Sequence, residues 1–149
     1  MPLYEINGKR PVIGANTYVH ESAEILGDVV IGEECYIAPG AAIRGDFGPV
    51  RIGDRTSIQD NCALHCRVGG SLTVGNEVTV GHAAVLHGCV IKDRTIVGMN
   101  SVVSDDTTVG EDCIIAECSM VRGGQQIPDA VVVAGVPAVV KGPLKDAQR

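Results

Sequence analysis

Aliphatic residues recur every six positions along most of the chain. The repeat shifts phase three times in the middle, and each of its positions is Ile, Leu or Val: 13, 19, 25, 31, 37 and 43, then 52, 58 and 64, then 74, 80 and 86, then 91, 97, 103, 109, 115, 121, 127, 133 and 139. A period of six matches neither the 3.6 residues of an amphipathic helix nor the alternation of an ordinary strand. The pattern therefore indicates a repeat protein.

The other positions of the hexad indicate how one repeat unit folds. The second position is often glycine, as in Gly32 and Gly53, and the fifth is small or β-branched, as in Cys35 and Thr56. Such a unit forms one short strand and one tight corner, and three units close a triangular coil of about 18 residues. We predict an all-β parallel β-helix of about seven coils in a single domain, with a lead-in over 1–12, coils over 13–140 and a tail over 141–149.

Composition and charge narrow the class of protein further. Only 3% of residues are aromatic and none is Trp, so stacked aliphatic side chains must replace the usual aromatic core. Six cysteines are present without zinc-ribbon CxxC pairs, so we expect reduced thiols, three of them (Cys35, Cys62 and Cys113) at small inward positions. A net charge of -6 without a basic stripe argues against nucleic acid as a partner.

No segment of the sequence predicts membrane insertion or export. The longest apolar run, residues 130–140, contains Pro137 and is too short to span a bilayer, and the N-terminal residues lack the apolar core of a signal peptide. We expect a cytoplasmic protein without membrane contact.

The predicted coils place polar residues in columns on three walls, called A, B and C. Wall A begins at Ile25, Ile43, Leu64, Leu86, Val103, Val121 and Val139. The residue after each inward aliphatic points outward, so Arg44, His65 and His87 form a column on wall A. Neighbouring strands are about 4.8 Å apart, which suits two imidazoles that share one metal ion.

His82 lies at the corner between walls C and A, five extended residues before His87 and up to about 16 Å from it. Within one chain it cannot easily join the same metal. In a ring of three identical subunits the corner of one chain can abut wall A of the next, which gives three equivalent sites. Asp60 occupies the same hexad position one coil earlier and should form an intersubunit ion pair with Arg44, and Asp46, beside the same column, is also expected at the interface.

Two stretches resemble the γ-class carbonic anhydrases and their relatives, including the phenylacetate-degradation and carnitine-operon hexapeptide proteins. They are RGDFGPVRIGDRTSIQDNCALH (44–65) and VGHAAVLHGCVI (80–91), and the ending AGVPAVVKG also resembles the closing segment of hexapeptide proteins. The resemblance implies a left-handed coil and a homotrimer. It also implies that His65 and His87 of one subunit and His82 of its neighbour hold one metal ion.

The same resemblance implies roles for the surrounding polar residues and a reaction. Gln59 would orient metal-bound water, and the interface would be held by Arg44, Asp46 and Asp60. One divalent ion per interface, zinc with iron or cobalt as alternatives, would keep a coordination position open, and the bound hydroxide would attack carbon dioxide to give bicarbonate.

Two departures from the archaeal pattern of that family bear on the expected rate. Phe47 follows Asp46 where the pattern has an acidic residue, and residues 66–73, after the first histidine, contain no carboxylate. Without a nearby proton acceptor, release of the proton from bound water should be slow. We therefore expect weak carbonic anhydrase activity.

Two other functions stay open on sequence grounds. One is acyl-CoA chemistry in the groove between subunits, either acyl transfer or thioester hydrolysis, with a histidine as general base. The other is a non-catalytic scaffold that retains the metal site. Three histidines at metal-ligand spacing favour the carbonic anhydrase hypothesis, whereas the missing carboxylates favour the alternatives.

Overall fold

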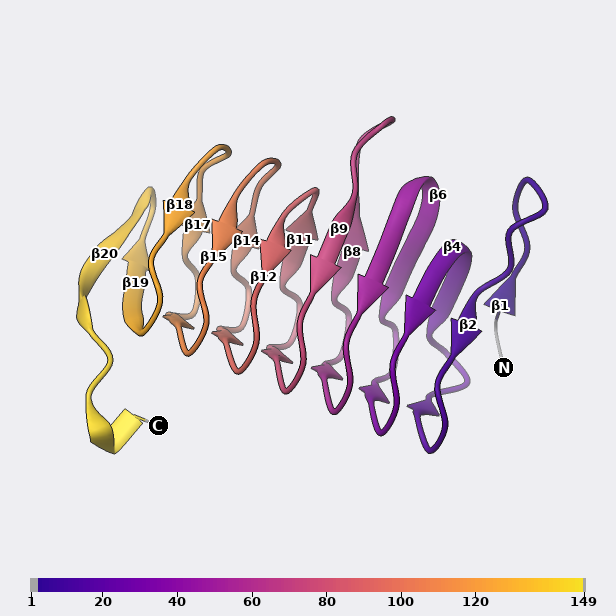
Figure 1. Cartoon of the computed structure of the whole chain (residues 1–149), viewed down its shortest axis with the longest axis horizontal. Coiled ribbons are helices and arrows are strands. Elements are labelled where there is room, and N and C mark those ends of the chain that lie inside the picture. Colours follow the sequence, from indigo (N-terminus) through magenta and orange to yellow (C-terminus); the bar gives the residue numbers. More distant parts are fainter. Residues whose placement is uncertain (1–2, 149) are drawn as a thin grey trace.

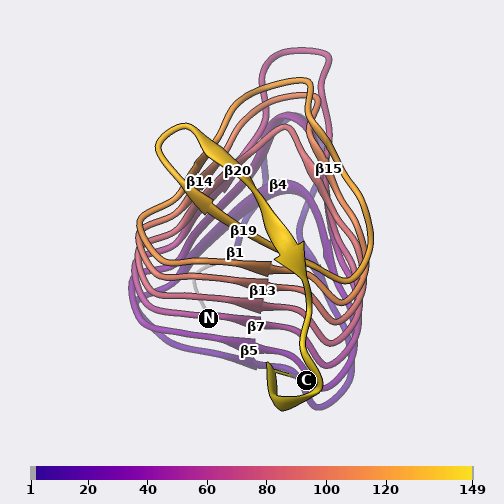
Figure 2. The ribbon, with the colours of Figure 1, turned by 90° about the vertical axis from the view of Figure 1, so that its left-hand side faces the viewer.

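The computed structural model describes residues 3–148, which form a left-handed parallel β-helix of about seven turns (Figure 1). Seen along its axis, the chain winds as a stack of triangular coils, with strands along the sides of the triangle and turns at its corners (Figure 2). The predicted fold class is confirmed. No helix among the described residues is long and apolar enough to cross a membrane.

Each wall is a stack of short strands. Wall A consists of the first halves of β4 (Glu24–Ile31) and β6 (Ala42–Ile52) together with β1 (Leu3–Tyr4), β8 (Ala63–His65), β11 (Val85–His87), β14 (Val102–Val103) and β17 (Met120–Val121). Wall B consists of the second halves of β4 (Glu24–Ile31) and β6 (Ala42–Ile52) together with β2 (Val12–Ile13), β9 (Leu72–Val74), β12 (Val90–Ile91), β15 (Thr108–Val109) and β18 (Gln126–Ile127).

Wall C is a separate sheet of eight strands: β3 (Tyr18–Val19), β5 (Tyr36–Ile37), β7 (Ser57–Ile58), β10 (Thr79–Val80), β13 (Ile96–Val97), β16 (Ile114–Ile115), β19 (Val131–Gly135) and β20 (Ala138–Pro143). A short 3-10 helix, η1 (Asp146–Gln148), follows.

The register between coils follows the inward aliphatic positions. On wall A, the partners run in the order Ile25, Ile43, Leu64, Leu86, Val103 and Val121. These side chains are buried, and no aromatic side chain occurs in the described core. Cys35, Cys62 and Cys113 are buried among them as small hydrophobic groups, and the described chain contains only free thiols. The predicted repeat positions thus set which residues share a wall.

The repeat ends earlier than predicted. Val139, expected to point inward as the last wall A position, is 52% exposed. The chain reverses direction after β19, and β20 pairs antiparallel with it instead of beginning another coil. Ala138 is buried at this end of the core instead. At the other end, Leu3 in the expected lead-in already pairs with Ile25 and packs against the core.

The first two phase shifts of the repeat correspond to extra residues at the corner between walls A and B, and the third, between Leu86 and Ile91, corresponds to one residue fewer than the regular six. In β4 and β6 the strand continues around this corner, as the long arrows in Figure 1 show. Between β8 and β9 the extra residues form a loop, residues 66–71, which stands out from the coils in both views (Figures 1 and 2). This 66–71 loop lies directly after His65 and is therefore placed beside the predicted site.

Neighbouring residues of β13 provide a direct test of the inward positions. Val97 is completely buried, whereas Ile96 is 43% exposed. Val97→Asp would place an unpaired carboxylate between coils and should lower the free energy of unfolding by more than about 4 kcal/mol, or prevent folding. Ile96→Asp should cost less than about 1 kcal/mol. Urea unfolding of the two variants measures the difference, and equal stability would contradict the register.

Candidate functional site on wall A

Two histidines stack on adjacent coils of wall A, as the periodicity predicts. His65 ends β8 and His87 ends β11, and the two residues are register partners. Their ring centroids lie 5.3 Å apart, with the rings inclined at 62°. Arg44 occupies the corresponding place on β6, after Ile43, which pairs with Leu64. The column is therefore confirmed, while metal binding by it stays a prediction.

Each of the three predicted metal ligands has a carboxylate partner in the same chain. His65 Nε2 lies 2.9 Å from Asp46 Oδ1, and His87 Nδ1 lies 3.0 Å from Asp105 Oδ2. His82 Nδ1 lies 3.0 Å from Asp60 Oδ2. An ionised carboxylate can only accept a hydrogen bond, so the ring nitrogen that faces it carries the proton. The opposite nitrogen is left as an acceptor: Nδ1 of His65, and Nε2 of His87 and His82.

Asp46 is held from two sides. Arg44 Nη1 donates to its Oδ2 at 2.8 Å while His65 donates to its Oδ1. Partial burial acts to raise the pKa of Asp46, but the hydrogen bond from His65 and the charge of Arg44 outweigh it, so the carboxyl titrates below its usual range. An ionised Asp46 orients the His65 ring through this hydrogen bond.

His82 and its carboxylate partner Asp60 lie at the corner between walls C and A, away from the stacked pair. Both side chains are about half exposed. Among residues 3–148, no three His, Cys, Asp or Glu side chains of one chain gather closely enough to hold a metal ion. The strand geometry had placed His82 out of reach of His87 within a chain, so a shared site requires a neighbouring subunit.

The remaining predicted residues lie around these two clusters. Gln59 directly precedes Asp60 at the corner and is partly exposed. Its proposed role toward metal-bound water is untested. Within the chain, Arg44 pairs with Asp46 and Asp60 pairs with His82. The ion pair between Arg44 and Asp60 across an interface therefore stays a prediction about the assembled protein.

Sequence reasoning missed Asp105 as the partner of His87. Asp105 lies at the corner between walls A and B of the next coil, two residues after the inward Val103 of β14. This corner position is the sequence signal that could have identified Asp105 as a residue near His87. Its approach depends on Gly88, which has a φ of +60°, because a Cβ at that residue would clash with Asp105 Oδ1. A glycine and an aspartate one coil apart therefore form the His87 environment together.

The cysteines beside the histidines are poor nucleophiles. Cys66 follows His65, and Cys89 lies two residues after His87. Burial raises the pKa of the Cys89 thiol to about 12 and that of the Cys66 thiol above its usual range. Both are therefore protonated near neutral pH, and any chemistry at this site falls to the imidazoles.

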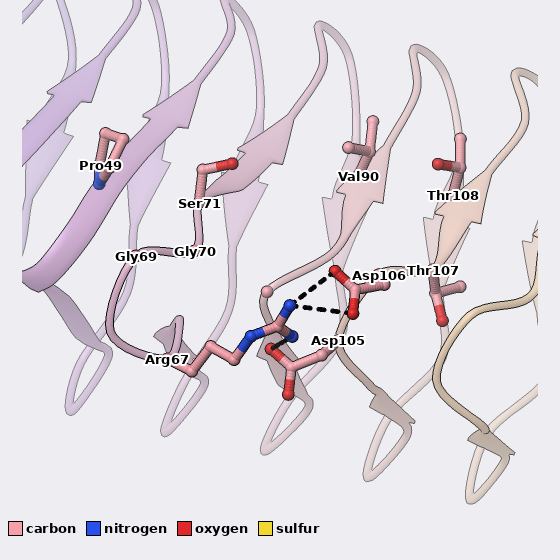
Figure 3. A pocket seen from close by; sticks show the side chains of 11 residues that line it. Pro49, Arg67, Gly69, Gly70, Ser71, Val90, Asp105, Asp106, Thr107 and Thr108 are labelled. Carbon is pink, nitrogen blue, oxygen red and sulfur yellow. Dashed lines mark hydrogen bonds and ion pairs between the residues drawn. The ribbon is translucent and has the colours of Figure 1, made fainter.

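A cavity of about 590 Å³ adjoins His87 on the wall B side (Figure 3). It lies under the 66–71 loop, and its lining includes Arg67, Gly88, Asp105, Asp106 and Thr108. Figure 3 shows the Arg67 side chain extended across it toward Asp105 and Asp106. The His87–Asp105 pair therefore lies at the boundary between the outer surface of wall A and this cavity.

Comparison with known proteins agrees with the fold and assigns the family. Residues 10–45 and 88–123 match the family model for the bacterial transferase hexapeptide (six repeats). Over 148 residues the chain is 38% identical to carnitine operon protein CaiE of Citrobacter koseri, covering 99% of this chain and 75% of CaiE. The chain belongs to the bacterial hexapeptide-repeat family, with CaiE among its relatives.

Two solved structures are similar to the chain over most of its length. A Bacillus cereus protein proposed to be an acetyltransferase superposes with a TM-score of 0.95 at 37% identity, covering 97% of this chain and 84% of that one. A Caulobacter crescentus perosamine N-acetyltransferase variant, solved with CoA and GDP-perosamine, gives a TM-score of 0.71 at 27% identity, covering 85% and 56%.

The role of Gly88 can be tested against a glycine in the neighbouring loop. Gly88 and Gly69 both have positive φ, but a Cβ at Gly69 would meet no atom within 4 Å. Because of the positive φ alone, alanine at either position should cost about 1 to 2 kcal/mol of stability, and the clash with Asp105 adds to this cost at Gly88. Only Gly88→Ala should displace Asp105 and change the protonated nitrogen of His87, measured by ¹⁵N NMR of the imidazoles. An unchanged His87 spectrum would contradict the proposed geometry.

Proposed function

We propose that the chain is a CoA-dependent acyltransferase whose general base is His87. The observation that carries the proposal is the His87–Asp105 pair, because the carboxylate holds Nδ1–H and leaves Nε2 as a proton acceptor on the outer surface of wall A. The side chain of His87 is 35% exposed, so a substrate can reach it. Membership of the hexapeptide-repeat family and the acetyltransferases among similar structures support this reaction class.

The proposed step uses groups that the chain supplies. His87 Nε2 takes a proton from the hydroxyl or amine of an acceptor as that atom attacks the thioester carbonyl of an acyl-CoA. The carbon–sulfur bond then breaks, and the CoA thiolate takes the proton from the imidazolium. Asp105 orients the ring and stabilises the imidazolium formed between the two proton transfers. No covalent enzyme intermediate is needed, which is consistent with the protonated state of the nearby thiols.

We place the reaction at the interface of a homotrimer. His65 and His87 lie on the outer surface of wall A, and His82 lies on the corner that a threefold neighbour would bring to it. From β6 to β17 the outward residues of wall A beside the histidine column are small or apolar (Ala42, Ala63, Val85, Val102 and Met120), whereas the same position on β4 is Glu24. Such a surface can pack against an identical subunit, with the acyl-CoA in the groove beside it.

A second candidate is metal-dependent hydration of carbon dioxide, which the stacked imidazoles favour. The free nitrogens of His65 and His87, with His82 of a neighbour, fit the donor chemistry of zinc, and each ring already has the carboxylate partner typical of metal-bound histidine. A bound zinc ion would lower the pKa of a water molecule. The Phe47 ring, 5.1 Å from the His65 ring, places an apolar group where a proton acceptor would be needed.

The acyltransferase proposal can be tested by the release of CoA thiol from acetyl-CoA in the presence of a set of amines and alcohols. His87→Ala should lower kcat by about 10² to 10⁴-fold, because it removes the base. Asp105→Asn should lower it by about 10 to 100-fold. His20→Ala is the matched control, because His20 hydrogen-bonds Ser22 and follows β3, the end strand of wall C, which β5 and β7 separate from β10.

The outcomes separate the reactions. Acyl transfer that survives His87→Ala would contradict the base assignment. Thiol release in the absence of any acceptor would identify thioester hydrolysis instead. Absence of CoA release with every acceptor, together with carbon dioxide hydration by the zinc-loaded protein, would favour the second candidate.

A further inference from the structure

The 66–71 loop connects the two stacked histidines to a coil beyond them. The loop packs against β6: Gly69 N donates to Phe47 O at 3.3 Å, and a Cβ at Gly48 would clash with Gly70 O. Its Arg67 side chain reaches in the other direction, past the coil of His87, to the corner after β14. The loop therefore spans from the coil before the histidine pair to the coil after it.

Arg67 contacts both aspartates at that corner. Its Nη2 lies 3.0 Å from Asp106, and its Nη1 lies 3.3 Å from Asp105 Oδ1 (Figure 3). Asp105 Oδ2 is the atom that accepts from His87 Nδ1. The two oxygens of the Asp105 carboxylate are thus engaged from opposite sides, one by the imidazole and the other by the guanidinium.

The Asp105 carboxylate depends on Arg67 for its charge balance. Asp105 Oδ1 is shielded from solvent and accepts no hydrogen bond within the described part of the chain. A shielded carboxylate oxygen without a donor is costly unless an opposite charge lies nearby. Arg67 supplies this charge, and the planar guanidinium also fixes the rotation of the carboxylate because it binds Asp106 at the same time.

From these contacts we infer that Arg67 is a positioning residue, which holds Asp105 in the orientation that selects the Nδ1–H form of His87. The 66–71 loop then acts as a brace for the site, and its basic residue lies in the segment after His65 that contains no carboxylate. The inference concerns the geometry of His87. Its consequence for turnover rests on the proposed acyltransferase function.

The test compares Arg67→Ala, Arg67→Lys and Asp106→Asn with the loop control Val68→Ala. Val68 is 75% exposed at the tip of the same loop. In ¹⁵N NMR spectra of the imidazoles, Arg67→Ala should convert His87 from a single Nδ1–H form to a mixture of both forms. Arg67→Lys should restore most of the wild-type signal, because it returns the charge. Asp106→Asn should give a smaller change than Arg67→Ala, because it loosens one anchor of Arg67 without touching Asp105.

Turnover gives an independent readout. Arg67→Ala should lower kcat for acyl transfer about tenfold with little change in KM for acetyl-CoA, whereas Val68→Ala should match wild type. A changed His87 spectrum in a protein without acyltransferase activity would support the inference and contradict the proposed function. A wild-type His87 spectrum in folded Arg67→Ala would overturn the inference, and if that variant does not fold, a wild-type spectrum in Asp106→Asn would overturn it.

Discussion

The stacking of inward aliphatic side chains in register is the interaction on which the rest of the structure depends. Parallel strands alternate inward and outward positions, so a slip of one residue would turn every outward side chain into the core. Ile43, Leu64 and Leu86 are buried partners on successive coils, and each is followed directly by a site residue. The hydrophobic core therefore places Arg44, His65 and His87 side by side without any contact between those residues being required.

The corners of the coils contribute a second layer of positioning. Extra residues between walls A and B bring the Asp46, Phe47 and Arg67 segments beside the histidines, while the regular coils elsewhere have no such extra residues. The carboxylates then determine which imidazole nitrogen is available. This arrangement serves a general base and a metal ligand equally well, because both require a neutral ring with one orientation and one free nitrogen.

Much of this could be predicted because the six-residue period converts sequence position into wall and coil. The pairing of His65 with His87 follows from their positions after Leu64 and Leu86, and the separation of His82 follows from the length of an extended strand. The period places Asp105 at the corner between walls A and B on the next coil, but its contact with His87 could not be predicted, because the contact depends on the turn geometry at Gly88. The burial of Val139 was predicted wrongly for a related reason: an aliphatic at the correct interval does not show whether the chain begins another coil or reverses into a hairpin.

The central claim is that the histidine column on wall A is completed by the corner of a neighbouring subunit, and mixed trimers test it most directly. His82→Ala and the double variant His65→Ala/His87→Ala should each bind almost no zinc, because every interface lacks a ligand. Co-refolded in equal amounts, three quarters of randomly assembled trimers contain both chains, and each mixed ring has one intact interface, so zinc content should recover to about a quarter of the wild-type value. Zero recovery, in samples in which mass spectrometry shows mixed trimers, would contradict a site shared between subunits.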